Sequence, residues 1–220
     1  MANIRLWASP GASATYFRLE ASLTNHTLTR GSPLDVGDLA GIDMVIVDGR
    51  FLIEAYYGVP ANLLAFVAAG GILICQSWSA SPTNEFLPLA VRTLFADKEW
   101  PYYAQLPATL TAASASPLLN GMSFPVNTTT EWTERATLDA GSEALLYLSC
   151  PAYGVTNSPV LASKPYGTNG GVIYNSAIRL FSDIQPSLLI DPIINNILAY
   201  ATDTNAPTCL SLTLPASVLV

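Results

Sequence analysis

The chain has 220 residues, of which 50% are hydrophobic and only 11% are charged, against about 25% charged residues in a typical soluble domain. This length and hydrophobic content predict a single domain with one sizeable core. A net charge of −7 with nine Lys and Arg does not supply the basic surface that nucleic-acid binding needs, so we exclude a nucleic-acid partner. No apolar run approaches the roughly 20 residues that span a bilayer, and the N-terminus shows no signal peptide. We therefore expect synthesis in the cytosol and no membrane partner.

The cysteines and the histidine exclude the common metal sites. Cys75, Cys150 and Cys209 are far apart and lack the CxxC spacing of zinc and redox motifs, and His26 is the one histidine of the chain. We therefore predict no metal and no other cofactor. The sequence leaves open whether Cys150 or Cys209 forms a disulfide.

The first third of the chain predicts alternating strands and helices. Residues 3–7 predict a strand, residues 13–23 a helix with apolar residues at helical spacing, and residues 27–30 a second short strand. Residues 42–77 then read as strand, helix and strand: GIDMVIVDG, PANLLAFVAAGG closed by two glycines, and ILICQSWSA. This order predicts a βαβ unit with buried parallel strands.

Open parallel sheets place their functional groups just beyond the carboxyl ends of the strands. In this βαβ unit the two strands end near an acid–glycine–arginine sequence and near a cysteine. The candidate residues are Asp48, Gly49, Arg50, Cys75, Gln76 and Ser77.

The middle of the chain is the least regular in sequence. Residues 79–85 predict a polar loop, and the apolar residues from about 86 to 95 predict a short helix. Residues 97–133 are rich in Pro, Ser and Thr, so we expect irregular structure there.

The last third again predicts regular elements. Residues 144–149 and 160–163 predict strands, and YGTNGG at 166–171 predicts a hairpin turn before a strand at 172–175. Residues 186–201 predict a helix with one apolar face, which closes the domain.

These elements predict an α/β fold of the flavodoxin-like type: an open, mostly parallel sheet with helices on both faces. We assign residues 1–202 to this domain and residues 203–220 to a C-terminal extension. In the extension, leucines alternate with Ser211 and Thr213, which predicts a strand that must pair with an edge of its own sheet or with a neighbouring subunit. The residues expected to act in assembly are Cys209, Leu210, Leu212 and Leu214.

The order of several short motifs resembles the class I glutamine amidotransferase-like superfamily, and most of all its trehalose-utilisation-type and other non-amidotransferase branches. The motifs are DMVIVDG, FVAAGGILI, SPLLNGM and PVLASKPYGTNGGVIYNSA, followed by a closing helix. The resemblance covers residues 1–202. It implies the fold just described, with a nucleophile elbow at the end of the second strand of the βαβ unit.

Carried over to this chain, the resemblance places the elbow at Cys75 or, with a shift of one residue, at Gln76. The small flanking residues of a G-x-C-x-G elbow are replaced by Leu73 and Ser77. The positions of the family's histidine and acid are occupied by Asn175 and Ser176. A thiol with a reference pKa of about 8.5 and no imidazole partner stays mostly protonated at neutral pH. The resemblance therefore implies the fold without amidotransferase chemistry.

Two interpretations remain for the residues at the strand ends. Cys75 is a buried small hydrophobe, or it is a thiol activated by a helix N-terminus and Arg50. Arg50 and Asp48 form a clamp for a carboxylate or phosphate, or a local ion pair of small energetic consequence.

Two functions of different classes follow. The first is a catalytically silent amidotransferase-like domain that acts as a structural or assembly subunit of a larger particle, for example a phage virion, with protein subunits as partners. The second is a small-ligand-binding protein or cysteine-dependent hydrolase that uses the cleft around Cys75. The ligand-binding residues would then be Asp48, Gly49, Arg50, Gln76, Ser77 and Asn175.

Overall fold

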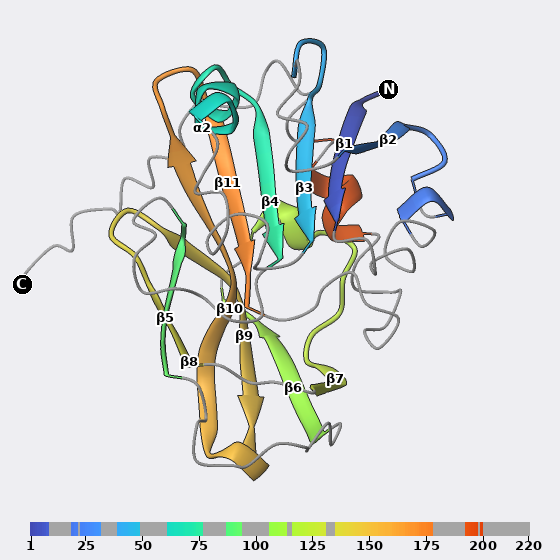
Figure 1. Cartoon of the computed structure of the whole chain (residues 1–220). Helices are drawn as coiled ribbons and strands as arrows, with labels where there is room; N and C mark the ends of the chain where they lie inside the picture. The colour runs from blue at the N-terminus through green and yellow to red at the C-terminus, as the bar shows by residue number, and fades with distance from the viewer. Residues whose placement is uncertain are drawn as a thin grey trace, which may run out of the picture.

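The fold is known from a computed structural model. It describes residues 1–8, 19–21, 23–31, 39–48, 61–76, 87–93, 106–113, 116–130, 135–177, 192–197 and 199. Its main feature is a nine-stranded sheet in the order β2-β1-β3-β4-β11-β10-β9-β6-β7, to which a two-stranded sheet, β5-β8, is added (Figure 1). The C-terminal extension, residues 203–220, lies outside the described residues.

The first half of the large sheet is parallel. It contains β1 (Asn3–Ala8), β2 (Thr27–Gly31), β3 (Met44–Asp48), β4 (Ile72–Gln76) and β11 (Gly171–Ser176). All four pairings among them are parallel, so their carboxyl ends lie along one edge of this half. The strands predicted at residues 3–7, 27–30 and 172–175 and the βαβ unit are confirmed.

The second half of the sheet is antiparallel. It contains β10 (Val155–Tyr166), β9 (Glu143–Cys150), β6 (Leu106–Ala112) and β7 (Val126–Thr130). Four antiparallel pairings connect β11 to β10, β9, β6 and β7 in turn. The prediction of a mostly parallel sheet was therefore wrong: the sheet is mixed, because β10 pairs antiparallel with both β11 and β9, and β6 pairs antiparallel with both β9 and β7.

β10 joins the two halves because it is much longer than its neighbour. β11 ends at Ser176, which pairs with Leu161, so the first six residues of β10 continue past the carboxyl end of β11. Those residues and the strands β9, β6 and β7 form a lobe that extends beyond the ends of the parallel strands (Figure 1).

Two predictions for the middle of the chain were also wrong. The short helix expected at residues 86–95 contains β5 (Leu89–Thr93), which pairs with β8 (Arg135–Leu138). The irregular segment expected at residues 97–133 contains both β6 and β7. The small sheet is attached to β10: the backbone N–H of Ala136 donates to the Ser158 hydroxyl at 3.1 Å, and Lys164 of β10 pairs with Asp139 just after β8.

In the described part of the chain, few helices cover the sheet. α2 (Ala61–Ala68) lies on one face, and helical residues 19–21 and 192–197 contribute to the core on the other. The expectation of helices on both faces is therefore met only by one helix on one face and two short helical segments on the other. α2 ends as the sequence predicts: Gly70 has φ +110°, and the N–H groups of Gly70 and Gly71 return to the carbonyls of Val67 and Phe66. This is the Schellman pattern. The described residues also contain two short 3₁₀ turns, Pro117–Leu119 and Pro151–Tyr153.

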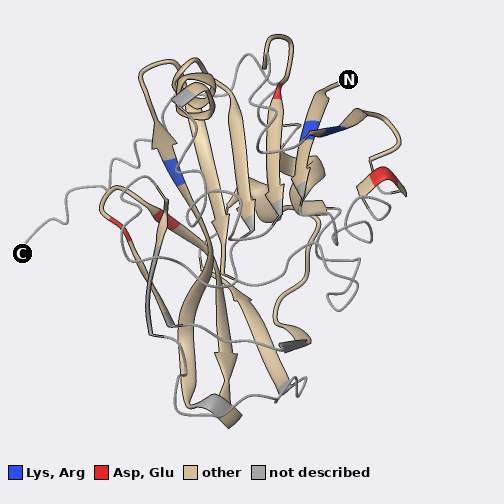
Figure 2. Ribbon diagram, viewed as in Figure 1, with Lys and Arg blue, Asp and Glu red and all other residues tan. Residues whose placement is uncertain are grey.

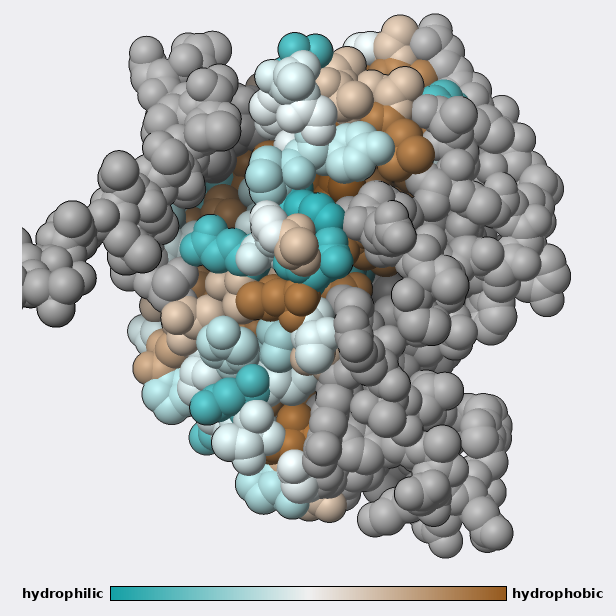
Figure 3. Space-filling view, turned by 90° about the vertical axis from the view of Figure 1, so that its left-hand side faces the viewer, coloured by the Kyte–Doolittle hydropathy of each residue, from teal (hydrophilic) through white to brown (hydrophobic). Residues whose placement is uncertain are grey.

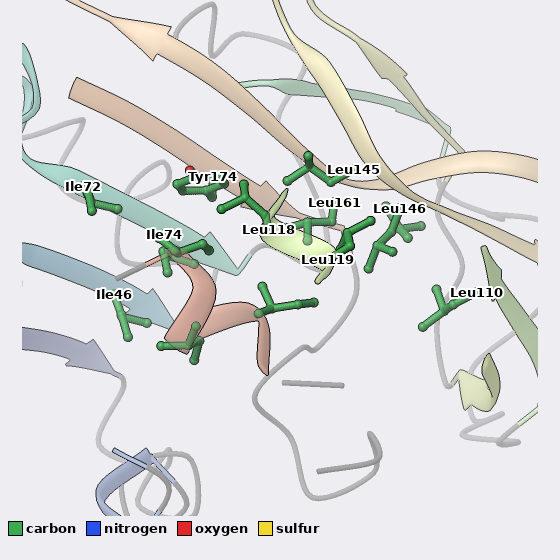
Figure 4. Close-up of a cluster of buried hydrophobic side chains, with 14 of the residues drawn as sticks. Ile46, Ile72, Ile74, Leu110, Leu118, Leu119, Leu145, Leu146, Leu161 and Tyr174 are labelled. Carbon is green, nitrogen blue, oxygen red and sulfur yellow. The ribbon is translucent and has the colours of Figure 1, made fainter. Parts of the chain in front are cut away.

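One hydrophobic cluster connects the two halves of the sheet (Figure 4). Ile46, Ile72, Ile74 and Tyr174 come from the parallel strands, and Leu110, Leu145, Leu146 and Leu161 come from the antiparallel ones. Leu118 and Leu119 of the first 3₁₀ turn lie between these groups, with Ile193, Ile194 and Ile197 of the C-terminal helical segment in the same cluster. The predicted apolar face of that segment is confirmed where it is described.

Candidate functional site

The carboxyl ends of the parallel strands bring the predicted site residues into two adjacent rows. Strand register aligns Trp7, Val47, Cys75 and Asn175 in the first row. It aligns Ala8, Asp48, Gln76 and Ser176 in the second. Successive residues of a strand point to opposite faces, so the first row belongs to the α2 side and Ser176 of the second row to the other side of the sheet.

Cys75 lies in the apolar layer under α2. Its exposed fraction is 2%, and it clusters with Trp7, Val47, Leu73 and Leu63. Among the described residues, neither Cys75 nor the equally buried Cys150 is part of a disulfide. A thiol in such a layer behaves as a small hydrophobic group.

The backbone at Cys75 is that of an ordinary strand. Cys75 pairs with Val47 on one side and Asn175 on the other, and the strand continues to Gln76. A nucleophile elbow instead holds its residue on a sharp, strained turn. Among the described non-glycine residues, only Asn157 has a positive φ, and it lies in β10. The geometry at Cys75 is therefore that of a packed strand residue.

Asn175 and Ser176 end β11 beside β4. The Asn175 side chain is 2% exposed and its Nδ2 donates to the Cys75 carbonyl oxygen at 3.2 Å. Ser176 is fully buried and pairs with Gln76. The amide of Asn175 thus binds the backbone of β4, and this contact ties the ends of two strands together.

His26 lies at the opposite end of the sheet from Cys75. It immediately precedes Thr27, which pairs with Asn3, whereas Cys75 lies in the row of Trp7. Trp7 lies four residue steps beyond Asn3 along the strand, or about 13 Å. His26 Nδ1 accepts a hydrogen bond from the Ala2 backbone N–H at 3.2 Å, and burial together with the nearby amino-terminal charge lowers the pKa of His26. It is not placed to act on Cys75.

The remaining predicted residues are only partly described. Asp48 and Gln76 end β3 and β4 side by side, and only their backbones are described. The other predicted positions at the strand ends, Gly49, Arg50 and Ser77, lie outside the described residues. So do the assembly residues Cys209, Leu210, Leu212 and Leu214.

The structure adds Trp7 to this region. Its side chain is 1% exposed, and its indole N–H has no hydrogen-bond partner in the described part of the chain. The indole packs over Gly31 at the end of β2, where an added Cβ would lie 2.7 Å from Nε1. Sequence reasoning identified the strand of Trp7 but not this buried donor, because no local pattern reveals where an indole nitrogen points.

The lobe beyond the strand ends has an unusual composition. We call residues 106–112, 126–130 and 144–163 the antiparallel lobe; none of these residues is charged, and Glu143 and Lys164 lie directly beyond its bounds. Figure 2 shows the lobe without blue or red. Figure 3 shows hydrophilic, intermediate and hydrophobic residues mixed over the described surface on the side of β5 and β8. The composition shows that the chain has few charged residues, but it does not show that one lobe has none.

A polar row crosses one face of the antiparallel lobe. Strand register aligns Asn127, Thr109 and Ser149 on β7, β6 and β9. Thr109 Oγ1 donates to Asn127 Oδ1 at 3.5 Å, and Ser149 Oγ lies 3.3 Å from Asn157 Oδ1 and accepts the Asn157 N–H at 3.1 Å. The alternation of Ala, Thr, Leu and Thr in β6 is the sequence signal that would have revealed this face.

Metal clusters and membrane spans are both absent from the described residues. Those residues contain no group of three or more His, Cys, Asp or Glu side chains arranged to hold a metal ion. Within the same parts of the chain, no helix combines the length and the apolar character needed to cross a membrane.

Comparison with known proteins shows the fold. No protein-family model matches the sequence, and no curated protein matches it. Among solved structures, the N-terminal domain of mmIFT52 superposes with a TM-score of 0.61 at 13% identity, over 92% of this chain and 98% of that one. A protein from Thermoplasma acidophilum described as part of a putative GMP synthase gives 0.58 at 9% identity, over 91% and 94%. A β-galactosidase from Rahnella sp. R3 gives 0.59 at 17% identity.

The chain has the fold of class I glutamine amidotransferase-like domains. A glutamine amidotransferase from Thermotoga maritima is also similar, with a TM-score of 0.52 at 8% identity, over 91% of this chain and 99% of that one. The likeness that the motif order suggested is thus confirmed for the fold. The superposition covers 90% of this chain but only 31% of the β-galactosidase, so there the similar region is one part of a longer chain.

Proposed function

We propose that this chain is a catalytically silent amidotransferase-like domain that serves as a structural subunit of a larger protein assembly. The observation that carries the proposal is the antiparallel lobe, whose described surface holds no charged side chain. Charged residues are depleted at the cores of protein interfaces, whereas exposed surfaces of monomers normally carry mixed charges. A charge-free lobe fits a subunit that is covered by protein.

The geometry at Cys75 supports the silent part of the proposal. Acyl-transfer chemistry needs a nucleophile exposed on a turn, with a base within hydrogen-bond reach. Cys75 is buried in a continuous strand, and the neighbouring strand presents Asn175, whose amide donor binds the Cys75 carbonyl. An amide nitrogen donates hydrogen bonds and does not take up a proton from a thiol.

The similar structures agree with use as a module. The fold forms an N-terminal domain in mmIFT52, one component of the putative GMP synthase and about a third of a longer β-galactosidase chain. The sequence of residues 203–220, with its alternating leucines, offers a segment by which one copy contacts another.

Light scattering after size exclusion tests the proposal. The full-length chain is expected to form oligomers whose mass rises with concentration, and a variant that ends at Thr202 is expected to shift toward monomers. A monomer for the full-length chain at every concentration would count against an assembly function. Release of ammonia from glutamine by the purified chain would count against a catalytically silent domain.

One observation favours small-ligand binding as a second function. The buried indole N–H of Trp7, without a partner among the described residues, lies at the carboxyl end of β1, where open parallel sheets bind ligands. Trp7→Phe removes this donor and keeps the ring bulk. A ligand that raises the melting temperature of the wild type and fails to stabilise Trp7→Phe would support this second function.

A further inference from the structure

The nine-stranded sheet has two terminal strands in the described part of the chain, β2 and β7. We propose that residues 208–214 of a second copy of this chain add to the sheet along β7 as a further strand. This inference rests on the proposed assembly function and names its contact surface. Strand addition of this kind obtains affinity from backbone hydrogen bonds and specificity from alternate side chains.

Charge distinguishes the two terminal strands. Natural sheets protect their edges with charged side chains, and long uncharged edges invite pairing with another chain. β2 carries the exposed Arg30, and beside it Arg5 Nε donates to Thr29 Oγ1 at 3.0 Å. β7 is Val-Asn-Thr-Thr-Thr and belongs to the uncharged antiparallel lobe. β2 is therefore protected by cations and β7 is not.

The two faces of the sheet at β7 differ in polarity. One face holds an apolar row in which Leu148, Leu110 and Val126 are aligned by register, with Leu148 and Leu110 fully buried. The other face holds the polar row that ends at Asn127. A strand that continues this sheet must therefore be apolar on one side and polar without charge on the other.

Residues 208–214 have that pattern. Their sequence is TCLSLTL: Leu210, Leu212 and Leu214 share one side of a strand, and Cys209, Ser211 and Thr213 share the other. The leucines would extend the apolar row past Val126. The small polar residues, with Cys209, would extend the polar row past Asn127.

A second copy explains the lobe better than the chain's own tail does. A tail that folded back on its own β7 would extend the sheet and leave the rest of the uncharged lobe facing solvent. A neighbouring copy brings its body as well as its tail to this surface. The contact joins two different surfaces, so it closes as a reciprocal exchange between two copies or continues as a ring or filament.

Site-directed crosslinking tests the proposal on the full chain. Asn127 is exposed and lies on the same side of the extended sheet as Cys209, so Asn127→Cys with a short bismaleimide should crosslink to Cys209. Val126→Cys is the matched control, because its side chain faces the opposite side and should crosslink several-fold less. Urea unfolding first establishes that both variants are folded.

A mixing experiment identifies the donor of the tail. A tagged Asn127→Cys, Cys209→Ser variant is mixed with the untagged wild type, and a crosslinked species that contains both chains is expected. Crosslinking only within single Asn127→Cys chains would assign the tail to its own β7 and overturn the proposal. Oligomers that form without any crosslink to β7 would overturn strand addition at β7 but would leave the proposed assembly function intact. A chain that stays monomeric would refute both proposals.

A second set of variants does not depend on the crosslinker. Leu212→Asn places an amide on the apolar side of the added strand and should raise the concentration for half-assembly at least about tenfold, the factor that corresponds to 1.4 kcal/mol. Thr213→Asn changes the polar side of the added strand and should alter the concentration for half-assembly less than about threefold. Equal effects of the two variants would contradict a strand with one side against the apolar row.

Discussion

Truncation of Cys75 separates a packing role from a catalytic one. Cys75→Ala removes one methylene-sized atom from a site that is 2% exposed, which costs about 0.8 kcal/mol in transfer free energy. If the neighbours do not relax, a cavity of roughly 25 Å³ adds about 0.6 kcal/mol. We therefore expect the free energy of unfolding to fall by about 1.4 kcal/mol, or about 3–6 °C in Tm for a chain of this length.

Urea denaturation followed by tryptophan fluorescence measures this loss, and Cys150→Ala provides the matched control. Cys150 is also fully buried in the same sheet and has no proposed chemical role, so its truncation should cost a similar amount. Catalytic residues are commonly held at a cost to stability, and replacing them often stabilises the protein. An unchanged or increased stability of Cys75→Ala, with the expected loss for Cys150→Ala, would refute the packing role.

Two further predictions concern the scaffold. Gly171→Ala should destabilise the fold by about 2–4 kcal/mol, because the new Cβ would lie 1.7 Å from the Val67 carbonyl oxygen of α2. The control, Gly170→Ala, places its Cβ in open space and should cost about 1 kcal/mol for its φ of +81°. Equal losses of stability for the two variants in urea denaturation would contradict this close approach of β11 to α2. The hydrogen bond from Lys164 lowers the pKa of Asp139 below its ordinary 3.8, so this pair stabilises the fold above pH 3.8 and the stabilisation is lost as the pH falls through the folded-state pKa. Asp139 is about a third exposed, so Asp139→Asn should lower the free energy of unfolding by about 0.5 kcal/mol at pH 7 and leave it unchanged near pH 2. If the variant is still less stable than the wild type in acid, the ion pair is not the cause of the loss.

The sequence predicted the parts of the fold that depend on local pattern. The βαβ unit follows from two apolar runs around a helix that ends at Gly70, where a positive φ suits glycine. The β10–β11 hairpin follows from its glycine-rich turn. Both signals lie within a few residues of the structure they determine.

The antiparallel lobe could not be predicted in this way. β6 pairs with β9 across the thirty residues that separate the two strands, and its Pro107 and threonines resemble a loop in composition. β5 is five residues long, and so short an apolar run fits a strand or a helix equally well. Only the pairing partners decide between these alternatives, and they are distant in sequence.

For the candidate site, the sequence located the strand ends but not the orientation of their side chains. It placed Cys75, Gln76 and Asn175 at neighbouring strand ends, as register confirms. The hydrogen bond from Asn175 to the Cys75 carbonyl and the buried indole of Trp7 depend on tertiary packing. The amide at position 175 thus acts on the backbone of β4, a contact that residue types alone do not indicate.

The rate of alkylation of Cys75 in the native full-length chain at neutral pH tests the central claim most directly. Iodoacetamide labelling is followed by mass spectrometry of the peptides that contain Cys75 and Cys150, with the urea-unfolded chain as reference. Both thiols are buried, Cys75 within β4 and Cys150 at the end of β9. We therefore expect both to react at least about a hundredfold more slowly than in urea, and at similar rates to each other. Rapid, selective modification of Cys75 would show an activated thiol and would contradict a silent scaffold.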